Sequence, residues 1–165
     1  MIRVSEKSIM SMERRDIFKE LDMGEYIWGN AYVYSVFDLD LSIETNRFLK
    51  LDEICKTENW KLLGDSWNSL DFSACSEMLM DSIEFDIAYS SARITPEEIA
   101  RKFHTTLLQD FKESDCHCYS NWFNNHWRSK EFGSSWNSLT ENTFDLSTVF
   151  VTRNKILITC FRSED

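Results

Sequence analysis

Apolar residues recur with a helical period in the stretch ITPEEIARKFHTTLLQDF, residues 94–111. They fall at every fourth position, namely Ile99, Phe103, Leu107 and Phe111. This period predicts a helix that runs to about residue 113. Thr95 is expected to cap this helix, with Pro96 at its first position and Glu98 completing a capping box.

Three further segments have apolar residues at helical spacing. The first covers residues 8–21, and residues 22–24 are expected to end it. The second begins with Ser42 as its N-cap, runs through residue 49 and breaks before residue 54. The third is rich in aromatic residues and covers residues 119–128. We therefore expect several packed helices.

Other segments have the composition or the alternation of β-strands. Residues 82–90, SIEFDIAYS, alternate apolar and acidic positions and predict a half-buried strand. The second half of residues 25–37 is rich in Tyr, Val and Phe and predicts another. Residues 143–162 predict a hairpin of two strands joined at Arg153 and Asn154. Both faces of these last strands are apolar, so we expect them at the centre of the sheet.

These elements predict one domain of the α+β class, covering residues 1–165. Its expected architecture is a mostly antiparallel sheet with a C-terminal β-hairpin and several helices packed against it. No stretch rich in Pro, Gly or Ser divides the chain, and 165 residues are enough to bury a substantial core.

The charge of the chain narrows the choice of partners. Asp and Glu total 28 against 18 Lys and Arg, which gives a formal net charge of −10. Such a chain would repel a phosphate backbone or an anionic membrane, so neither nucleic acid nor membrane is expected as a partner. A basic protein fits better, because opposite charge steers association. The alternative interpretation is that the acidity serves solubility alone.

The spacing of the cysteines and the length of the apolar runs indicate the cellular compartment of the protein. Five cysteines, an odd number, are scattered without the spacing of a disulfide framework. The first sixteen residues contain no apolar run of signal-peptide length, and no stretch is long enough to span a membrane. We therefore expect a cytoplasmic protein.

One seven-residue phrase occurs twice with a single change, as GDSWNSL at 64–70 and GSSWNSL at 133–139. Two copies are too few for a repeat architecture. Gly, Ser and Asn favour a turn, so the favoured interpretation is a pair of turns anchored by Trp67 and Trp136. The alternative is two loops that present these Trp side chains to a partner. Exposure of the two rings distinguishes the interpretations.

The sequence contains no motif that requires catalysis or a cofactor. Cys116, His117, Cys118 and His126 lack the spacing of a structural zinc site, so we expect no metal. The histidines His104, His117 and His126 remain candidates for acid-base chemistry, without a nucleophile, zinc-protease or phosphate-loop motif beside them. We therefore predict that the protein is not an enzyme and needs no cofactor.

Acidic residues near aromatic ones are the better candidates for a site. Asp38 and Asp40 follow a predicted strand, and Glu44 lies near the next helix start. Asp65 and Asp71 bracket Trp67. Each of these carboxylates could simply complement a helix dipole, but together they would also suit a basic partner surface.

The end of the chain resembles a known class of proteins. The stretches TFDLS (143–147) and ILITCF (156–161) and the acidic tail SED (163–165), with the size, acidity and aromatic content, are similar to bacterial immunity proteins of contact-dependent inhibition and related polymorphic toxin systems. The resemblance covers about the last fifth of the chain in detail. It implies a cytosolic, non-enzymatic protein that binds and neutralises a cognate toxin domain, often a basic nuclease.

On charge and aromatic character alone, we predict a partner-binding set within this protein. Its members are Asp38, Asp40, Glu44, Asp65, Trp67, Asp71 and Trp136. Three alternatives stay open: an acidic mimic of DNA, a small hydrolase or nuclease that uses His104, His117 and His126, and a non-catalytic interaction module that uses the two Trp loops.

Overall fold

A computed structural model describes residues 11–22, 28–128 and 135–164, and all the described strands belong to one sheet. The strands are β1 (Met12–Asp16), β2 (Gly29–Val36), β3 (Asn68–Leu70), β4 (His117–Ser120), β5 (Phe144–Leu146), β6 (Thr148–Val151) and β7 (Lys155–Ser163). The helices are α2 (Ile17–Leu21), α3 (Glu44–Thr57), α4 (Phe72–Glu84) and α5 (Glu97–Leu107), with a 3₁₀ turn at Glu113–Asp115. Every strand pairing is antiparallel, which confirms the predicted α+β class.

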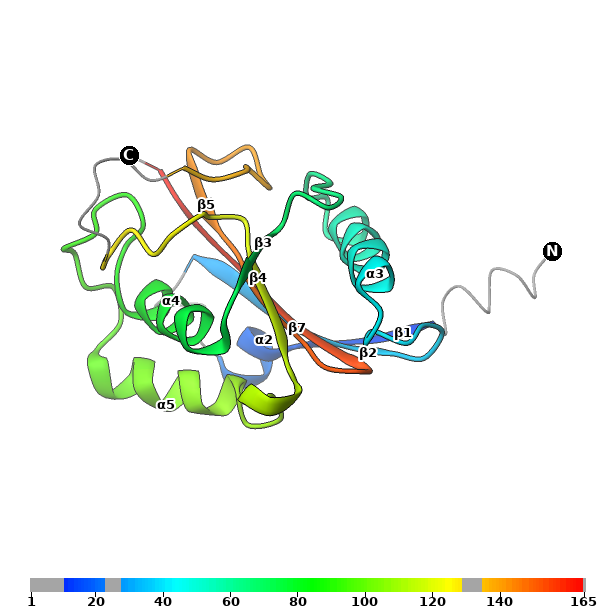
Figure 1. Ribbon diagram of the computed structural model, residues 1–165. Coiled ribbons are helices and arrows are strands. Elements are labelled where there is room, and N and C mark those ends of the chain that lie inside the picture. Colours follow the sequence, from blue (N-terminus) through cyan, green and yellow to red (C-terminus); the bar gives the residue numbers. More distant parts are fainter. Residues whose placement is uncertain (1–10, 23–27, 129–134, 165) are drawn as a thin grey trace.

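The helices cover the sheet on both faces. Strand order is β1-β2-β7-β6-β4-β3. β5 lies off this order and pairs with the C-terminal residues of β7, while β6 pairs with residues nearer its start. In Figure 1, α4 and α5 lie on one side of the sheet and α3 lies on the other. Two core clusters result, because alternate residues of each central strand face opposite layers. Leu157 and Phe161 join the core under α4 and α5, while Ile156 and Ile158 join the core under α3.

The predicted hairpin is confirmed and lies at the centre of the sheet. β6 and β7 are joined through Arg153 and Asn154, and both are buried along nearly their whole length. The first predicted strand is divided in two at Ser147, however. The backbone N–H of Ser147 donates to Asn121 Oδ1 at 2.7 Å, which takes this residue out of the ladder between β5 and β6.

The predicted N-terminal helix is only partly correct. Residues 17–21 are helical and Asp22 ends the helix in the left-handed conformation, but Met12–Asp16 form strand β1, and residues 8–10 lie outside the described part of the chain. β1 pairs with β2, and the Arg14 guanidinium lies 4.0 Å from the centroid of the Tyr32 ring. Pairing with a partner strand distant in sequence therefore outweighs the helical pattern.

The prediction of a strand at 82–90 is wrong. Residues 82–84 are the last turn of α4, a helix that the sequence analysis missed. α4 buries Cys75, Met78, Leu79 and Ile83 at helical spacing. The side chain of Asp71 caps it by accepting a hydrogen bond from the backbone N–H of Ala74 at 2.7 Å. The helical spacing of apolar residues in α4 continues to residue 84 and so overlaps the alternating segment 82–90. At these positions the helical spacing outweighs the local alternation of apolar and acidic residues.

The predicted helix at 119–128 is also wrong. Tyr119 and Ser120 belong to strand β4, and residues 121–128 form turns. Trp122 is buried, and its ring stacks on Trp136 with 4.4 Å between centroids. The indole Nε1–H of Trp122 donates to the backbone carbonyl of Asp145 at 2.6 Å. The aromatic side chains thus pack between loops and a strand instead of along one helix.

The two remaining helices differ from the prediction at their ends. α3 is continuous through Ile54, and its N-cap is Ile43, because Ser42 Oγ donates to Asp40 instead. α5 ends at Leu107 instead of near residue 113, although Phe111 is still buried. Its N-cap is Pro96, with no side-chain cap, so the predicted capping role of Thr95 is wrong.

A buried carboxylate fixes the connection before β5. Asp145 Oδ1 and Oδ2 accept hydrogen bonds from the backbone N–H groups of Leu139 and Thr140, from Thr140 Oγ1, from Ser138 Oγ and from Asn121 Nδ2, at 2.8 to 3.2 Å. Asp145 itself is fully buried. A charge without water needs such a set of donors, so the Asp145 side chain holds the loop 138–140 against the sheet.

We expect Asp145→Asn to destabilise the protein by about 2 to 4 kcal/mol, because an amide places a donor where the carboxylate accepts and leaves a buried N–H group unpaired. Chemical denaturation measures the change in the free energy of unfolding. Asp65→Asn, at an exposed position, serves as the matched control and should stay within about 0.5 kcal/mol of the native chain. Equal stability of the two variants would contradict the role given to Asp145.

Candidate functional site

Acidic and apolar side chains gather where β2 ends. We call this region the acidic end surface and define it by Phe37, Asp38, Asp40, Ile43, Glu44, Leu49 and Glu53. It consists of the loop from β2 to α3 and the first turns of α3. The loop is held against the β6–β7 turn, because Val36 N–H donates to Asn154 O at 2.8 Å and Leu41 N–H donates to Arg153 O at 3.0 Å. The Leu41 side chain is buried in the core under α3.

Asp40 is fixed in its charged form within this loop. Its Oδ1 accepts hydrogen bonds from Ser42 Oγ at 2.7 Å and from Ser42 N–H at 3.0 Å, and Arg153 Nε lies 3.8 Å away. The hydrogen bonds from Ser42, with a smaller contribution from Arg153, lower the pKa of Asp40. This carboxylate is therefore ionised and oriented before any partner arrives.

A buried lysine joins the loop to α3. Lys50 Nζ donates to Asp38 Oδ1 at 2.9 Å and to Glu53 Oε2 at 2.7 Å, and the Lys50 side chain is fully buried while both carboxylates are partly exposed. Burial by itself lowers the pKa of Lys50, but the hydrogen bonds to Glu53 and Asp38 outweigh it, and the pKa is raised. Two carboxylates share one cation, so the cluster keeps a net negative charge.

Three large apolar side chains are exposed among these acids. The exposed fractions are 62% for Phe37, 51% for Ile43 and 61% for Leu49. Phe37 and Ile43 flank the loop that holds Asp38 and Asp40, and Leu49 lies one helical turn before Glu53. Single exposed apolar residues are common on protein surfaces, but a group of them set between charges is typical of an interaction site.

The polar edge of this surface continues to the start of β4. Glu44 is exposed and lies 3.9 Å from the guanidinium of Arg47, which is itself buried and donates to Tyr119 Oη at 2.8 Å. Burial and the nearby Arg47 lower the pKa of His117, and Glu44 opposes this shift. The first strand residue of β4 is therefore electrostatically coupled to the surface.

Asp38, Asp40 and Glu44 of the predicted set thus come together, and the other four members lie elsewhere. Asp71 caps α4, and Asp65 is exposed on the loop before β3. Trp67 is only 5% exposed and packs in the core under α3. Its predicted role in contacting a partner is therefore corrected, since a buried ring anchors the fold. Trp136 is half-buried and stacked on Trp122.

The two copies of the repeated phrase lie against each other. Asn137 Nδ2 donates to Ser66 O at 3.2 Å, and Lys61 N–H donates to Leu139 O at 2.8 Å. Asn68 Nδ2 donates to the carbonyl of Trp122, at the stack that holds Trp136. These contacts agree with the interpretation of the described residues of both copies as packed turns, while Gly133 and Ser134 lie outside the described residues.

The three histidines occupy three separate settings. His104 Nε2 lies 3.0 Å from the carbonyl oxygen of Ser76 on α4. His117 begins β4, and His126 contacts the rings of Trp122 and Trp127. Within the described residues, no carboxylate hydrogen-bonds to any of the three histidines. Nothing in this arrangement pairs a base with an orienting acid, which acid-base catalysis by a histidine commonly uses.

Burial keeps four cysteines, Cys55, Cys75, Cys116 and Cys160, as protonated thiols at neutral pH. Burial, followed by nearby acidic groups or a second thiol, raises the pKa of Cys55 and of Cys116 to about 12. Burial also raises the pKa of Cys75 and of Cys160. The described residues contain no group of three His, Cys, Asp or Glu that could hold a metal ion. A nucleophilic thiolate would need the opposite shift in pKa.

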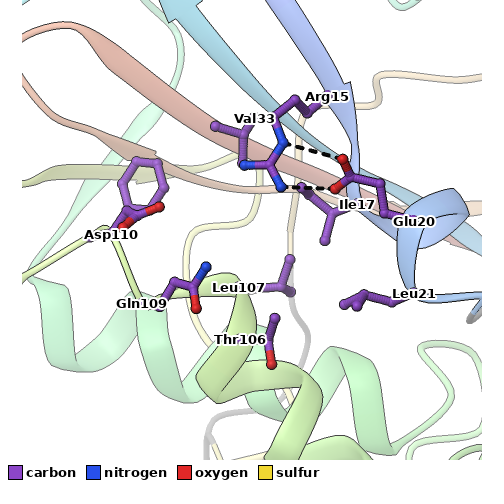
Figure 2. A pocket seen from close by; sticks show the side chains of 10 residues that line it. Arg15, Ile17, Glu20, Leu21, Val33, Thr106, Leu107, Gln109 and Asp110 are labelled. Carbon is purple, nitrogen blue, oxygen red and sulfur yellow. Dashed lines mark hydrogen bonds and ion pairs between the residues drawn. The ribbon is translucent and has the colours of Figure 1, made fainter.

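A cavity between α2 and the end of α5 is too small for a substrate. Figure 2 shows it lined by Ile17 and Val33 on one side and by Thr106 and Leu107 on the other, and its volume is about 50 Å³. Two of the charged residues in its lining, Arg15 and Glu20, form an ion pair at 2.9 Å, shown by the dashed lines. Such a volume holds one or two water molecules.

Comparison with models of known protein families and with curated proteins finds no match for this chain. None of the described helices is both long and apolar enough to cross a membrane.

Sequence reasoning missed the apolar half of this surface and its buried cation. Phe37 and Ile43 were not singled out, and Leu49 was included only in a helical pattern. The burial of Lys50 gives no signal in the sequence, because a lysine in a helix is usually exposed. The spacing of Lys50 and Glu53, three residues apart in one helix, could have indicated their ion pair.

The histidines make the stability of the protein depend on pH. Burial lowers the pKa of His104 below its ordinary 6.5, so the unfolded chain binds a proton more readily than the folded one. The contribution of His104 to the free energy of unfolding is therefore complete at high pH, and it is lost as pH falls through the ordinary pKa of histidine. We expect a lower free energy of unfolding at about pH 5.5 than at about pH 7.5, measured by denaturant titration.

His104→Gln should reduce this pH dependence, because the glutamine amide can still donate to Ser76 O but does not titrate. Lys102→Gln, at an exposed position of α5, is the matched control and should leave the pH dependence unchanged. An unaltered pH dependence in His104→Gln would refute the contribution of this histidine.

Proposed function

We propose that the protein is an immunity protein, which binds a cognate toxin domain of basic, nuclease type and neutralises it. The observation that carries the proposal is the acidic end surface, where the loop from β2 and α3 carry Asp38, Asp40, Glu44 and Glu53 together with the exposed side chains of Phe37, Ile43 and Leu49. Such a combination supplies the apolar anchors and the charge that a tight interface with a basic protein needs.

The fixed geometry of the carboxylates supports tight binding. Asp40 is held by Ser42, and Asp38 and Glu53 are held by the buried Lys50. Side chains that are already ordered lose less conformational entropy when a partner binds. A surface of this kind binds more strongly than the same residues on a mobile loop would.

The net charge of −10 supports the choice of partner. Nuclease domains that bind phosphate backbones carry positive surfaces, and an acidic protein competes with nucleic acid for them. Long-range attraction also raises the association rate, which favours an inhibitor that must capture a toxin quickly. Because the toxin would act on nucleic acid inside the cell, we place the protein in the cytoplasm. The five cysteines form no disulfide with one another, and free cysteines are typical of that location.

The proposal makes the protein a binding protein and not an enzyme. It acts by covering the toxin's active site or a neighbouring surface, without a chemical step and without a cofactor. The settings of His104, His117 and His126 favour no competing hydrolase mechanism. A binding mechanism needs only surface complementarity, which the acidic end surface provides.

The test is affinity capture from the native host with the native chain and with the triple variant Phe37→Ala, Ile43→Ala, Leu49→Ala. We expect the native chain to capture one basic protein in equimolar amount, and the variant to bind it at least tenfold more weakly, a loss of about 1.4 kcal/mol or more. Titration calorimetry with the purified partner gives both dissociation constants. Growth of cells that express the partner then reports protection.

The matched control is the double variant Leu62→Ala, Tyr89→Ala, which removes exposed apolar side chains outside the acidic end surface. It should bind and protect like the native chain. If the triple variant is folded and still binds the partner equally well, the acidic end surface is not the binding site. If the captured protein is neither basic nor toxic to the cell, the proposed function is wrong.

A further inference from the structure

A second candidate site lies at the opposite end of β2. Trp28 precedes this strand and Arg162 lies near the end of β7, and Arg162 N–H donates to Trp28 O at 2.9 Å. β2 has eight residues between Trp28 and Phe37, so roughly 25 Å separates this position from the acidic end surface. The two sites are therefore independent.

Arg162 differs from the other arginines that the structure describes. Arg14, Arg15, Arg47, Arg93, Arg101, Arg128 and Arg153 each form an ion pair with at least one carboxylate. Within the described residues, no carboxylate lies at ion-pair distance from the guanidinium of Arg162. Acidic residues exceed basic ones by ten in this chain, so an arginine without an ion pair among the described carboxylates offers a position for an anion.

An exposed indole lies beside this cation. The Trp28 side chain is 52% exposed, and the Arg162 guanidinium lies 6.0 Å from the centroid of its ring. A guanidinium at this distance from an aromatic face is attracted by the ring and keeps its hydrogen-bond donors available. The pair thus combines a flat apolar surface with a donor for a carboxylate.

A cavity of about 190 Å³ adjoins the pair. Its walls are formed by Trp28, Ser82, Phe85, Asp86, Ile87, Ile94, Phe161, Arg162 and Ser163. This volume is below the range of sites for drug-sized ligands, so the occupant is small. Most of the lining is apolar or aromatic, and Ser163 Oγ is already engaged with Asp86 Oδ1 at 2.9 Å.

Among the described residues, Asp86 is the one acid in this lining, and its side chain bonds to its own loop. Asp86 Oδ1 accepts hydrogen bonds from the backbone N–H groups of Ala88 and Tyr89, at 2.8 and 3.0 Å, in addition to the Ser163 hydroxyl. These donors offset the charge of Asp86. Arg162 remains the group in this lining that can pair with a ligand's charge.

We propose that this cavity binds a small planar carboxylate, with its carboxylate on Arg162 and its flat apolar body against Trp28 and the cavity wall. The bidentate geometry of a guanidinium suits a carboxylate, and the aromatic and aliphatic lining suits a ring. The inference does not rest on the proposed immunity function, because it uses no residue of the acidic end surface.

The test is titration of the full chain with benzoate, followed by the amide signals of the protein and the indole signals of its Trp residues in nuclear magnetic resonance. Benzamide, which has the same shape and no charge, is the ligand control. We expect benzoate to bind with a millimolar or lower dissociation constant, to shift the Trp28 signals and to bind at least tenfold more tightly than benzamide.

Arg162→Gln should weaken benzoate binding at least tenfold, and Arg162→Lys should retain part of it. Arg101→Gln, an exposed arginine on α5, is the matched control and should bind like the native chain. If Arg162→Gln binds benzoate normally, if benzamide binds as well as benzoate, or if the native chain does not bind, the proposal is overturned. Thermal unfolding of each variant verifies that it is folded. If Arg162→Gln is unfolded, benzoate binding is compared between the native chain and Arg162→Lys.

Discussion

The architecture depends on the burial of β6 and β7 on both faces. Each strand has apolar side chains on two sides, so the sheet must be covered twice to remove them from water. α4 and α5 cover one face, and α3 covers the other (Figure 1). This second layer also creates the acidic end surface, because α3 can pack on the sheet only if the loop from β2 crosses its edge.

Two buried ionic groups show how the chain satisfies charge away from water. Lys50 is fully buried and pairs with two carboxylates, and Asp145 is fully buried and accepts hydrogen bonds from several donors. In both cases desolvation opposes the charged form, and the surrounding partners compensate for it. The two groups differ in their access to solvent. The carboxylates that pair with Lys50 are partly exposed, while Asp145 and its hydrogen bonds lie inside the protein. Lys50 therefore contributes to a surface, and Asp145 to the fold.

The two ends of the central strands present opposite chemistry. Carboxylates and exposed apolar side chains share the loop and helix where β2 ends, while an exposed indole lies before it begins, beside a guanidinium that forms no ion pair with any described carboxylate. The strands separate these regions in space, so a protein partner and a small anion would not compete for one position. Screening by salt weakens both attractions but leaves the apolar contacts unchanged.

Local sequence patterns were sufficient for the α+β class, the central hairpin, the strand at β2 and much of the helix at α5. Hydrophobic period and turn residues encode these features within a few neighbouring positions. Three members of the acidic set, Asp38, Asp40 and Glu44, could also be named from their spacing after the strand. Their grouping in the structure follows from a single short loop.

Tertiary structure alone decided the rest, because it depends on residues far apart in the chain. Residues 12–16 became a strand through pairing with β2, and Trp67 became a core residue through packing on the α3 layer. The burial of Lys50 and the lack of an ion pair between Arg162 and any described carboxylate likewise depend on which residues the fold brings close together. The sequence by itself determined which side chains were available, and long-range packing determined which of them are buried and which remain free to bind.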